Sequence, residues 1–563
     1  MKYLQLSGLY RMVENRITVS TISDWNALNN TVGGRLFTAI PFSSSCFSEV
    51  NGHSVTPDQE QCDIIQQNYS NATFRSSQFN NFMNTQWESC MSTNSQCALD
   101  AANASDSLAW TDLPCEQGSI APHYIDIRNY TDIQSAFNFS NATGVPLSIK
   151  NSGHDYFGRS SVAGSLGLWT RNLEHISYNA SFVPDGGNKS YPAMTIGAGV
   201  PWEDAYIFAD LNNVTIIGGY SQTVGASGGW LLGGGHSVLS PVFGLGVDRV
   251  LQFKLVTPDG KYRTANAYTN PDLFWALKGG GGGTFGVVTE STMIVEPRTI
   301  PLQVAAFSFN ATTNTNTDFL AILAKSSLQW AHQGWGGHLR LNGLISINPL
   351  LSLEQAKKSM QNITDFVQRN NGTGGVETVS SWYEFFVKYV LTAEEPIGIE
   401  AAISSRLIPS SVFESQEARN ALVETVANAE QYFLTISTVT PFIYKNYTEH
   451  STSVTPAWRD AVWHLLFVDL WSWNTTTDGK IAVFQTLSNL TAALTDIAPD
   501  SGVYLNEANI YEPDWEHAFW GENYPKLLAI KYKYDPAGLL NCWRCVGWKG
   551  RKDSLSQCYP ALD

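Results

Sequence analysis

Short apolar segments alternate with helical patterns and glycine-rich loops in the first half of the chain. Three segments have the apolar runs or the alternation of buried strands, at residues 123–127, 146–149 and 194–200. Two others have helical patterns, at residues 132–137, beginning with an aspartate that can act as a cap, and at 202–212. The pattern predicts a domain of mixed strands and helices at residues 118–299.

The pattern changes after residue 300, where glycine punctuation is lost. Helical patterns at residues 317–333 and 353–369 combine with a strand pattern at 337–347, which predicts an α+β domain at 300–502. Residues 1–117 form a cysteine-, serine- and asparagine-rich extension with short helices, and residues 503–563 form a C-terminal segment. No apolar run is long enough to span a bilayer, so no membrane partner is expected.

Composition agrees with this division. A chain of 563 residues is too long for one ordinary core and favours two closely packed domains. Aromatic residues make up 12%, with 18 Trp, which suits a large pocket lined by flat surfaces. The formal net charge of −16 argues against nucleic acid, because a phosphate backbone demands a basic face. A small molecule is therefore the expected partner, and the sequence carries no prediction of oligomeric state.

The strongest chemical signal lies at residues 150–160, where His154 follows Asn151, Ser152 and Gly153. A glycine-dense run follows at residues 218–235. Small residues let backbone N–H groups approach a pyrophosphate closely, because a Cβ would collide with the phosphate oxygens. The two segments are typical of a flavin-linked oxidase, in which the histidine can act as a covalent tether.

Four ordered blocks resemble the FAD-linked oxidases of the vanillyl-alcohol oxidase superfamily, and within it the berberine-bridge-enzyme-like branch: residues 150–160, 219–235, 270–289 and 504–535. In this resemblance His154 matches the residue that bonds the benzene-ring methyl group of the flavin. Ser221 occupies the place where many members carry a second tethering cysteine. A hydroxyl cannot replace the thiolate, so the resemblance implies FAD held by a single covalent linkage through His154.

The resemblance also implies an α+β, two-domain FAD-binding oxidase fold. Its parts are a bipartite flavin domain, to which residues 503–563 return, and a substrate domain with an antiparallel sheet. The implied cofactor-binding residues are Lys150, Asn151, Ser152, Gly153, His154, Asp155, Ser160, Ser221, Thr223, Val224, Gly225, Gly228, Gly229, Gly235, Gly286, Val288 and Asn506.

The expected catalytic residues lie in the fourth block, at Tyr504, Asn506 and Glu507. Relatives use a tyrosine or a carboxylate from the substrate domain or the C-terminal strand as the base. If residues 504–509 form a strand, Tyr504 and Asn506 share one face while Glu507 points to the other.

The implied reaction is the removal of a hydride from an alcohol, a sugar or a secondary-metabolite C–H bond, with transfer of electrons to oxygen to give hydrogen peroxide. Two alternatives stay open: a flavin dehydrogenase with another acceptor, and a flavin-binding protein without turnover. Carbohydrates, phenolic alcohols and secondary-metabolite intermediates all stay open as substrates.

Three features have plainer interpretations. An isolated loop histidine is more often solvated than a ligand, but the surrounding blocks favour the tether for His154. The glycine run at residues 279–283 resembles a linker by composition, although Trp275 and Phe285 beside it favour burial. His236, directly after three glycines, is interpreted as structural because nothing in its sequence neighbourhood supplies a partner.

The eight cysteines lie in the two terminal segments, which predicts disulfides within each group. The first group is Cys46, Cys62, Cys90, Cys97 and Cys115, and the second is Cys542, Cys545 and Cys558. Cys542 and Cys545 also have the spacing of a redox dithiol or of half a zinc site. No second pair has metal-ligand spacing, so no metal is predicted.

Numerous Asn-x-Ser/Thr sequons predict a secreted glycoprotein, at Asn68, Asn71, Asn103, Asn129, Asn138, Asn179, Asn188, Asn213, Asn310, Asn362, Asn446 and Asn489. The N-terminus disagrees, because residues 1–20 carry Arg11, Glu14 and Arg16 and show no signal peptide. An incorrectly assigned first exon would reconcile the two observations. Residence in the cytosol is the competing interpretation.

Overall fold

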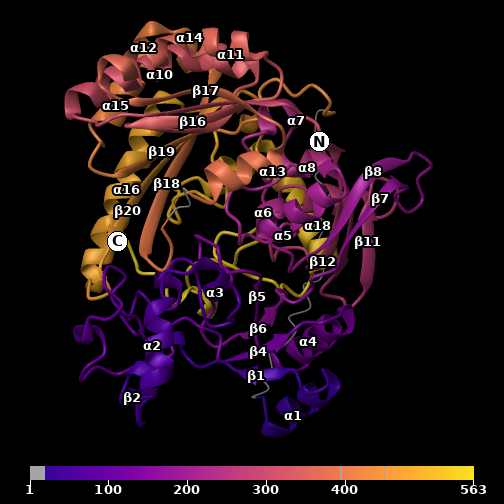
Figure 1. Ribbon diagram of the computed structural model, residues 1–563. Helices are drawn as coiled ribbons and strands as arrows, with labels where there is room; N and C mark the ends of the chain where they lie inside the picture. Colours follow the sequence, from indigo (N-terminus) through magenta and orange to yellow (C-terminus); the bar gives the residue numbers. More distant parts are fainter. Residues whose placement is uncertain (1–19, 393–395, 449, 563) are drawn as a thin grey trace, which may run out of the picture.

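The computed structural model describes residues 20–392, 396–448 and 450–562, with sheets at both ends of the molecule and helices around them (Figure 1). Residues 1–19, which hold most of the stretch without a signal-peptide pattern, lie outside the described residues.

The lower part of the molecule in Figure 1 contains a four-stranded sheet with the order β1-β4-β6-β5. Its strands are β1 (Leu36–Thr38), β4 (His123–Asp126), β5 (Leu147–Lys150) and β6 (Leu166–Trp169). β4 and β5 both pair in parallel with β6, whereas β1 pairs antiparallel with β4. The N-terminal extension thus contributes a strand to the sheet that ends at the predicted flavin loop.

A five-stranded antiparallel sheet follows, with the order β11-β10-β12-β8-β7. Its strands are β7 (Ile176–Phe182), β8 (Tyr191–Gly197), β10 (Val250–Val256), β11 (Tyr262–Asn266) and β12 (Val287–Ile294). Helix α5 (Trp202–Leu211) buries Trp202 and Tyr206, and Tyr206 contacts Trp382 and Phe386 of the next domain at ring-centroid distances of 5.3 and 4.9 Å. Apolar packing therefore continues from one domain into the other.

The upper part is a seven-stranded antiparallel sheet with the order β17-β14-β16-β15-β19-β20-β18. Its strands are β14 (Leu302–Ser308), β15 (Gly336–Arg340), β16 (Gly343–Asn348), β17 (Thr373–Val379), β18 (Glu400–Pro409), β19 (Phe433–Thr438) and β20 (Ala461–Trp471). One face carries a layer of helices (Figure 1): α10 (Thr313–Gln333), α11 (Leu353–Ser359), α12 (Gln361–Arg369), α14 (Ser410–Glu414) and α15 (Gln416–Ala427). The α+β prediction for this region is confirmed.

Several predicted elements have different bounds. The helix predicted to begin at Asp132 is α4 (Tyr130–Thr143), whose cap is Asn129, while Asp132 closes the capping box. The prediction of one strand at residues 337–347 is wrong, because these residues form two antiparallel strands, β15 and β16, joined by a hairpin turn. The sequence held the signal for this turn in Asn342-Gly343, a favoured hairpin dipeptide. The helix predicted at 353–369 is interrupted at Met360.

The C-terminal segment packs against the glycine run at residues 279–283. In helix α17 (Trp515–Trp520), the Trp520 indole N–H donates to the Gly279 carbonyl at 2.9 Å. In helix α18 (Tyr524–Tyr534), the Lys531 ammonium donates to the carbonyls of Thr284 and Leu540 at 2.7 and 2.6 Å. The glycine run is therefore held between two parts of the protein, as its flanking apolar residues indicated.

All eight cysteines form disulfides, but not entirely in the predicted groups. Three bonds stay within a group: Cys46–Cys62, Cys97–Cys115 and Cys542–Cys545. The fourth, Cys90–Cys558, joins the N-terminal extension to the C-terminal segment across 468 residues. With five cysteines in the first group, one had to pair outside it, and the tertiary fold brings Cys558 to Cys90.

We expect this long-range disulfide to matter most for stability. Cys90→Ser with Cys558→Ser should lower the free energy of unfolding by about 2–5 kcal/mol, because a long loop in the unfolded chain is released. Cys542→Ser with Cys545→Ser is the control, since that bond closes a loop of sequence separation 3. Urea unfolding of the two double variants measures the difference, and equal losses would contradict the argument.

Within the described residues, no helix is long and apolar enough to cross a membrane.

Candidate active site

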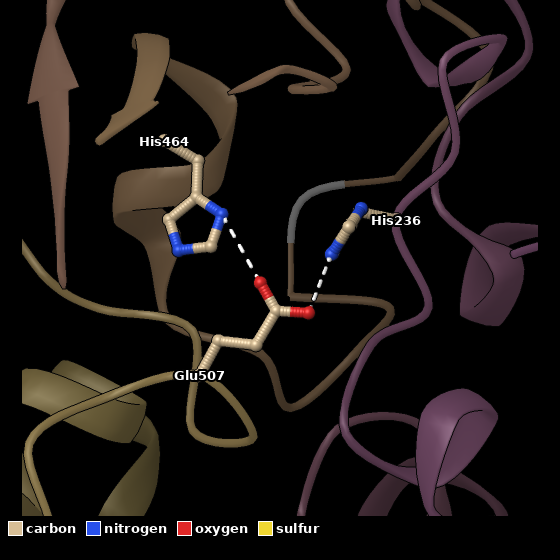
Figure 2. A group of neighbouring side chains, drawn as sticks. All are labelled: His236, His464 and Glu507. Carbon is tan, nitrogen blue, oxygen red and sulfur yellow. Dashed lines mark hydrogen bonds and ion pairs between the residues drawn. The ribbon is translucent and has the colours of Figure 1, made fainter. Parts of the chain in front are cut away.

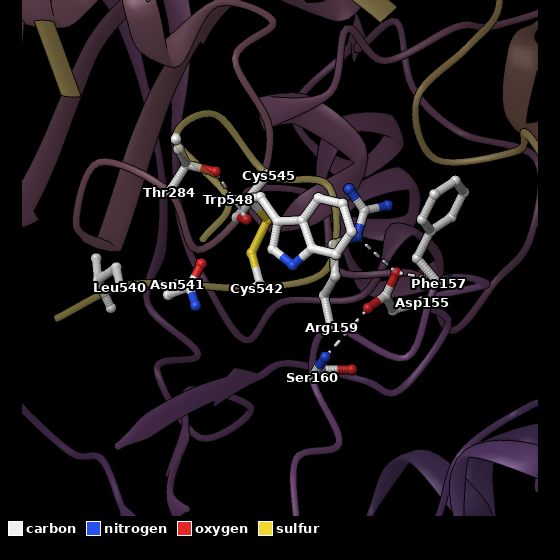
Figure 3. The surroundings of a disulfide bond; sticks show 12 residues. Asp155, Phe157, Arg159, Ser160, Thr284, Leu540, Asn541, Cys542, Cys545 and Trp548 are labelled. Atoms are coloured by element: carbon white, nitrogen blue, oxygen red, sulfur yellow. Dashed lines mark hydrogen bonds and ion pairs between the residues drawn. A yellow bond between two sulfur atoms is a disulfide. The ribbon is translucent and has the colours of Figure 1, made fainter. Parts of the chain in front are cut away.

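The predicted flavin loop leaves the end of β5 and is fixed by its own side chains. The Asp155 carboxylate accepts hydrogen bonds from the backbone N–H groups of Phe157 and Ser160, both at 3.1 Å, and lies 3.4 Å from the Arg159 guanidinium (Figure 3). Gly153 has a φ of +92° and lies where a Cβ would come within 2.9 Å of the Asn81 carbonyl. Both its backbone angle and its close packing require glycine there.

His154 projects from this loop and meets the glycine-rich run. Its Nε2 lies 2.7 Å from the Thr223 hydroxyl, which fixes the ring and engages one of its two nitrogens. Burial, and then the positive charge of Lys150, lower the pKa of His154 to about 4. The imidazole is therefore neutral at pH 7, and Nδ1 is the nitrogen that Thr223 does not engage.

The glycine-rich run provides a surface that a cofactor can approach. A Cβ on Gly225 or Gly228 would come within 2.5 or 2.9 Å of the Asn151 side chain, so these positions let the run pack on the loop. At Gly229, no atom of the described residues lies within 4 Å of the corresponding point. In the same cavity, Asn151 Oδ1 and Ser160 Oγ are buried without a hydrogen-bond partner among the described residues. The Ser160 hydroxyl can donate to an anionic group such as a pyrophosphate, and Asn151 Oδ1 can accept from a hydroxyl or N–H group of a polar ligand.

A single cavity of about 600 Å³ runs from the flavin loop to the seven-stranded sheet. Most of the predicted cofactor residues line it: Asn151, Ser152, Gly153, His154, Asp155, Ser160, Ser221, Val224, Gly225, Gly228, Gly229, Gly286, Val288 and Asn506. Three lie behind its wall. Thr223 holds His154, the Lys150 ammonium donates to the Gln78 carbonyl at 3.0 Å, and Gly235 packs against Trp230.

The beginning of the C-terminal segment brings the three predicted catalytic residues to the cavity. Residues 504–507 form a turn rather than a strand, since the Glu507 N–H donates to the Tyr504 carbonyl at 2.9 Å. The expectation that Glu507 points away from Tyr504 and Asn506 is therefore wrong, and all three line the cavity. The Asn506 amide donates to the Tyr504 hydroxyl at 2.8 Å and to the Gly229 carbonyl at 3.0 Å.

Two histidines from distant parts of the chain flank Glu507 (Figure 2). His236 Nε2 lies 3.2 Å from one carboxylate oxygen, and His464 Nδ1 lies 3.6 Å from the other. His236 follows the glycine-rich run, and His464 lies on β20. Among the described residues, none hydrogen-bonds to Nδ1 of His236. The premise that His236 lacks a partner is thus corrected: its partner comes from 271 residues away.

The charges of this cluster are set by burial and by neighbours. Burial alone would raise the pKa of Glu507, but the electrostatic effect and the hydrogen bond of His236, with smaller effects of His464 and His338, outweigh burial and hold that pKa below its usual value. Burial lowers the pKa of His464 to about 4 against the opposing effect of Glu507. Burial, and then the charge of Glu507, raise the pKa of Tyr504. At pH 7 the cluster holds a carboxylate, a neutral His464 and a phenol that acts as a donor.

The three groups also have the geometry of a metal-ligand set. One ligand atom from each of His236, His464 and Glu507 lies within 4.8 Å of the others, and two imidazoles with a carboxylate suit divalent transition metals. Sequence reasoning predicted no metal from cysteine spacing alone and missed His464 and His338 entirely. His464 lies among apolar residues in a strand, and nothing in that sequence pattern marks it as a functional residue.

Two family models match the chain. The model described as "FAD binding domain" matches residues 121–266, and the model described as "Berberine and berberine like" matches residues 503–542. The FAD-linked oxidoreductase ffsJ of Aspergillus flavipes is 41% identical over 94% of this chain and 93% of its own length. The chain belongs to the berberine-bridge-enzyme-like branch of the vanillyl-alcohol oxidase superfamily. It is an FAD-linked oxidoreductase.

Other members of the superfamily share its architecture. The FAD-linked oxidoreductase OXR2 of Pyricularia oryzae is 41% identical over 96% of this chain and 94% of its own. The VAO-type flavoprotein MtVAO615 of Myceliophthora thermophila is 26% identical, covers 95% of this chain and 96% of its own, and superposes with a TM-score of 0.81. The glucooligosaccharide oxidase of Acremonium strictum, which has a 6-S-cysteinyl, 8α-N1-histidyl FAD, has a TM-score of 0.64 at 22% identity, over 76% of this chain and 92% of its own. These structures confirm the two-domain α+β fold.

The berberine-like segment completes the wall of the cavity at the flavin-domain end. Leu540, Asn541 and Cys542 line the cavity, and the Cys542–Cys545 disulfide fixes the chain directly after them (Figure 3). The cavity is thus lined by both the predicted flavin loop and the C-terminal segment.

Proposed function

We propose that this protein is an FAD-dependent oxidase that removes a hydride from an alcohol, a sugar or a secondary-metabolite C–H bond and passes the electrons to oxygen, which forms hydrogen peroxide. The observation that carries the proposal is the hydrogen-bonded His236–Glu507 group in the same cavity as His154. When bound there, FAD supplies the electron acceptor for such a reaction. The oxidases among the structural neighbours support oxygen as the final acceptor.

His236 and Glu507 are the groups that we propose to take the substrate proton. Glu507 engages Nε2 of His236, which leaves Nδ1 to accept the hydroxyl proton, and the carboxylate stabilises the imidazolium that forms. Tyr504 stays protonated and donates a hydrogen bond, and Asn506 holds its hydroxyl at 2.8 Å. In this proposal His236 is the base. Glu507 orients and stabilises that base, and its side chain also lines the cavity.

We further propose that His154 would hold FAD through one covalent bond from Nδ1 to the benzene-ring methyl carbon; a C–H bond of that methyl group is lost as the bond forms, its hydrogen leaves as a proton, and its two electrons would pass through the flavin to oxygen. Thr223 engages Nε2 at 2.7 Å, and the lowered pKa keeps the imidazole neutral and nucleophilic. Ser221 lines the cavity where a second tether would need a thiolate, and its hydroxyl cannot form that bond. The remaining polar contacts would come from Asn151, Ser160 and the glycine surface beside them.

The central test is reduction of the flavin without oxygen, followed by admission of air. A compound from a panel of primary alcohols, phenolic alcohols and oligosaccharides should bleach the flavin absorbance, and oxygen should restore it with one hydrogen peroxide formed per turnover. Restoration only by an artificial acceptor would identify a dehydrogenase. A panel that leaves the absorbance unchanged would support a flavin-binding protein without turnover.

The surface supports secretion and N-glycosylation. Eleven of the twelve named sequon asparagines are exposed, with Asn68 half-buried, and four disulfides are present. We expect the protein made in a fungal host to reach the medium and to lose mass on treatment with an N-glycosidase. Retention in the cytosol with an unchanged mass would contradict this proposal.

A further inference from the structure

One wall of the cavity changes in polarity along the strands that form it. On β20, His464, Leu466, Val468 and Leu470 share one face of the sheet because strand side chains alternate. The exposed fraction rises along this row, from 0% at His464 to 51% at Leu470. The row therefore leads from the cluster at Glu507 to the mouth of the cavity.

Strand β19 repeats the same gradient beside it. Ser437 pairs with His464, Thr435 with Leu466 and Phe433 with Val468. Phe433 is 41% exposed, whereas Thr435 and Ser437 are buried. Polar groups thus gather at the inner end of the wall, and an exposed aromatic ring lies at its outer end.

Strand β18 extends the apolar outer half on the other side of β20. Ile403 pairs with Val468, and Ala401 pairs with Leu470. Both line the cavity. Arg340 is the charged side chain of this wall, and its guanidinium carbon lies 5.2 Å from the centroid of the Phe433 ring. Apolar side chains on three adjacent strands accordingly form one continuous surface, which we call the apolar ramp: Ala401, Ile403, Phe433, Leu466, Val468 and Leu470.

We infer that the substrate has a bulky apolar body and one hydroxyl-bearing end. The apolar ramp covers the body, and the hydroxyl reaches the His236–Glu507 group; the assignment of the hydroxyl rests on the proposed oxidase function. A sugar presents hydroxyls along its whole length, and each loses hydrogen bonds to water on binding unless a partner replaces them. The apolar ramp replaces none of them. Leu470 and Phe433 at the mouth are an exposed apolar surface continuous with an enclosed cavity, which is typical of a ligand groove.

Binding of a homologous series of alcohols to the holoenzyme tests this inference without requiring turnover. Butanol, hexanol, octanol, decanol and xylobiose are titrated anaerobically, and the change in the spectrum of the oxidised flavin gives each dissociation constant. We expect affinity to rise by about threefold for each added methylene, as burial of apolar surface predicts. Affinity that does not depend on chain length, or xylobiose binding more tightly than decanol, would overturn the inference.

Two leucines with similar exposure provide a matched pair of variants. Leu470 lies on the apolar ramp and is 51% exposed, while Leu350 is 55% exposed and does not line the cavity. Leu470→Ser should weaken decanol binding about fivefold and leave butanol unchanged, because only the longer chain reaches the mouth. Leu350→Ser should leave both unchanged. Equal effects of the two variants on decanol would count against the ramp as the binding surface.

The same titrations separate this inference from the proposed function. If affinity rises with the alkyl chain length of the alcohol but no alcohol reduces the flavin, the inferred substrate class is supported and the oxidase proposal is contradicted. Reduction of the flavin by xylobiose, with no binding of decanol, would support an oxidase and overturn the apolar substrate.

Discussion

Glu507→Gln should lower kcat/KM by about 10²- to 10⁴-fold while the protein still folds and binds FAD. Glutamine keeps the size of the side chain and an oxygen that can accept from His236, but it removes the negative charge that stabilises the imidazolium. Because Glu507 lies 3.2 Å from His236, the substitution should slow proton transfer to His236 without changing the shape of the cavity. Stopped-flow measurement of anaerobic flavin reduction gives the rate directly, with substrate from the panel described above.

Glu400→Gln is the matched control. Glu400 is buried but does not line the cavity, and burial raises its pKa to about 8, so it is neutral at pH 7 and the substitution preserves its charge. This variant should reduce its flavin at the normal rate. A Glu507→Gln enzyme as fast as the Glu400→Gln enzyme would rule out the His236–Glu507 group as the base.

Removal of bound metal gives a second control on the same cluster. The acid–base role of His236 needs no ion, so prolonged dialysis against a chelator should leave the reduction rate unchanged. If activity is lost on dialysis and restored by a single divalent metal, then His236, His464 and Glu507 act as its ligands instead, as their 4.8 Å grouping permits.

His154→Ala should abolish the covalent attachment of FAD, so that acid precipitation releases all the flavin into the supernatant. The variant should still fold and bind FAD, because the glycine surface and the loop around Asn151 and Ser160 remain. Its flavin should be reduced about tenfold more slowly or worse, since the electron-withdrawing linkage is gone. In the native protein, mass spectrometry should find the flavin on the peptide that contains His154. Flavin on another peptide would contradict the assignment.

The Thr223 hydroxyl, which contacts His154, provides a graded test of the proposed covalent bond between His154 and FAD. Thr223→Val removes the group at 2.7 Å that holds Nε2, so the protein should carry a mixture of attached and free flavin.

Since the pKa of His154 is about 4, its imidazole is neutral throughout the range from pH 5 to pH 8, and attachment of FAD to apoprotein should proceed at a constant rate there. A rate that falls as the pH drops through 6.5 would show that His154 titrates as an ordinary histidine.

The sequence by itself determined the parts of the protein that depend on nearby residues. Strand β5, the loop around His154 and helix α5 follow from apolar periodicity and from small residues within one short segment. The flavin family could be recognised for the same reason, because its motifs are local. Where local signals were misread, as at the Asn342-Gly343 turn, the information was still present in the chain.

Only the tertiary structure decided which distant residues meet. His236 and Glu507 are 271 residues apart, and no local pattern marks either as the partner of the other. Cys90 and Cys558 are 468 residues apart, so clustering along the sequence missed this bond, although the other three disulfides lie within the predicted groups. The apolar ramp likewise depends on the register of β18, β19 and β20, which pair strands from separate segments. Such contacts arise from the packing of whole sheets and domains, and this packing depends on the entire chain rather than on any one segment of it.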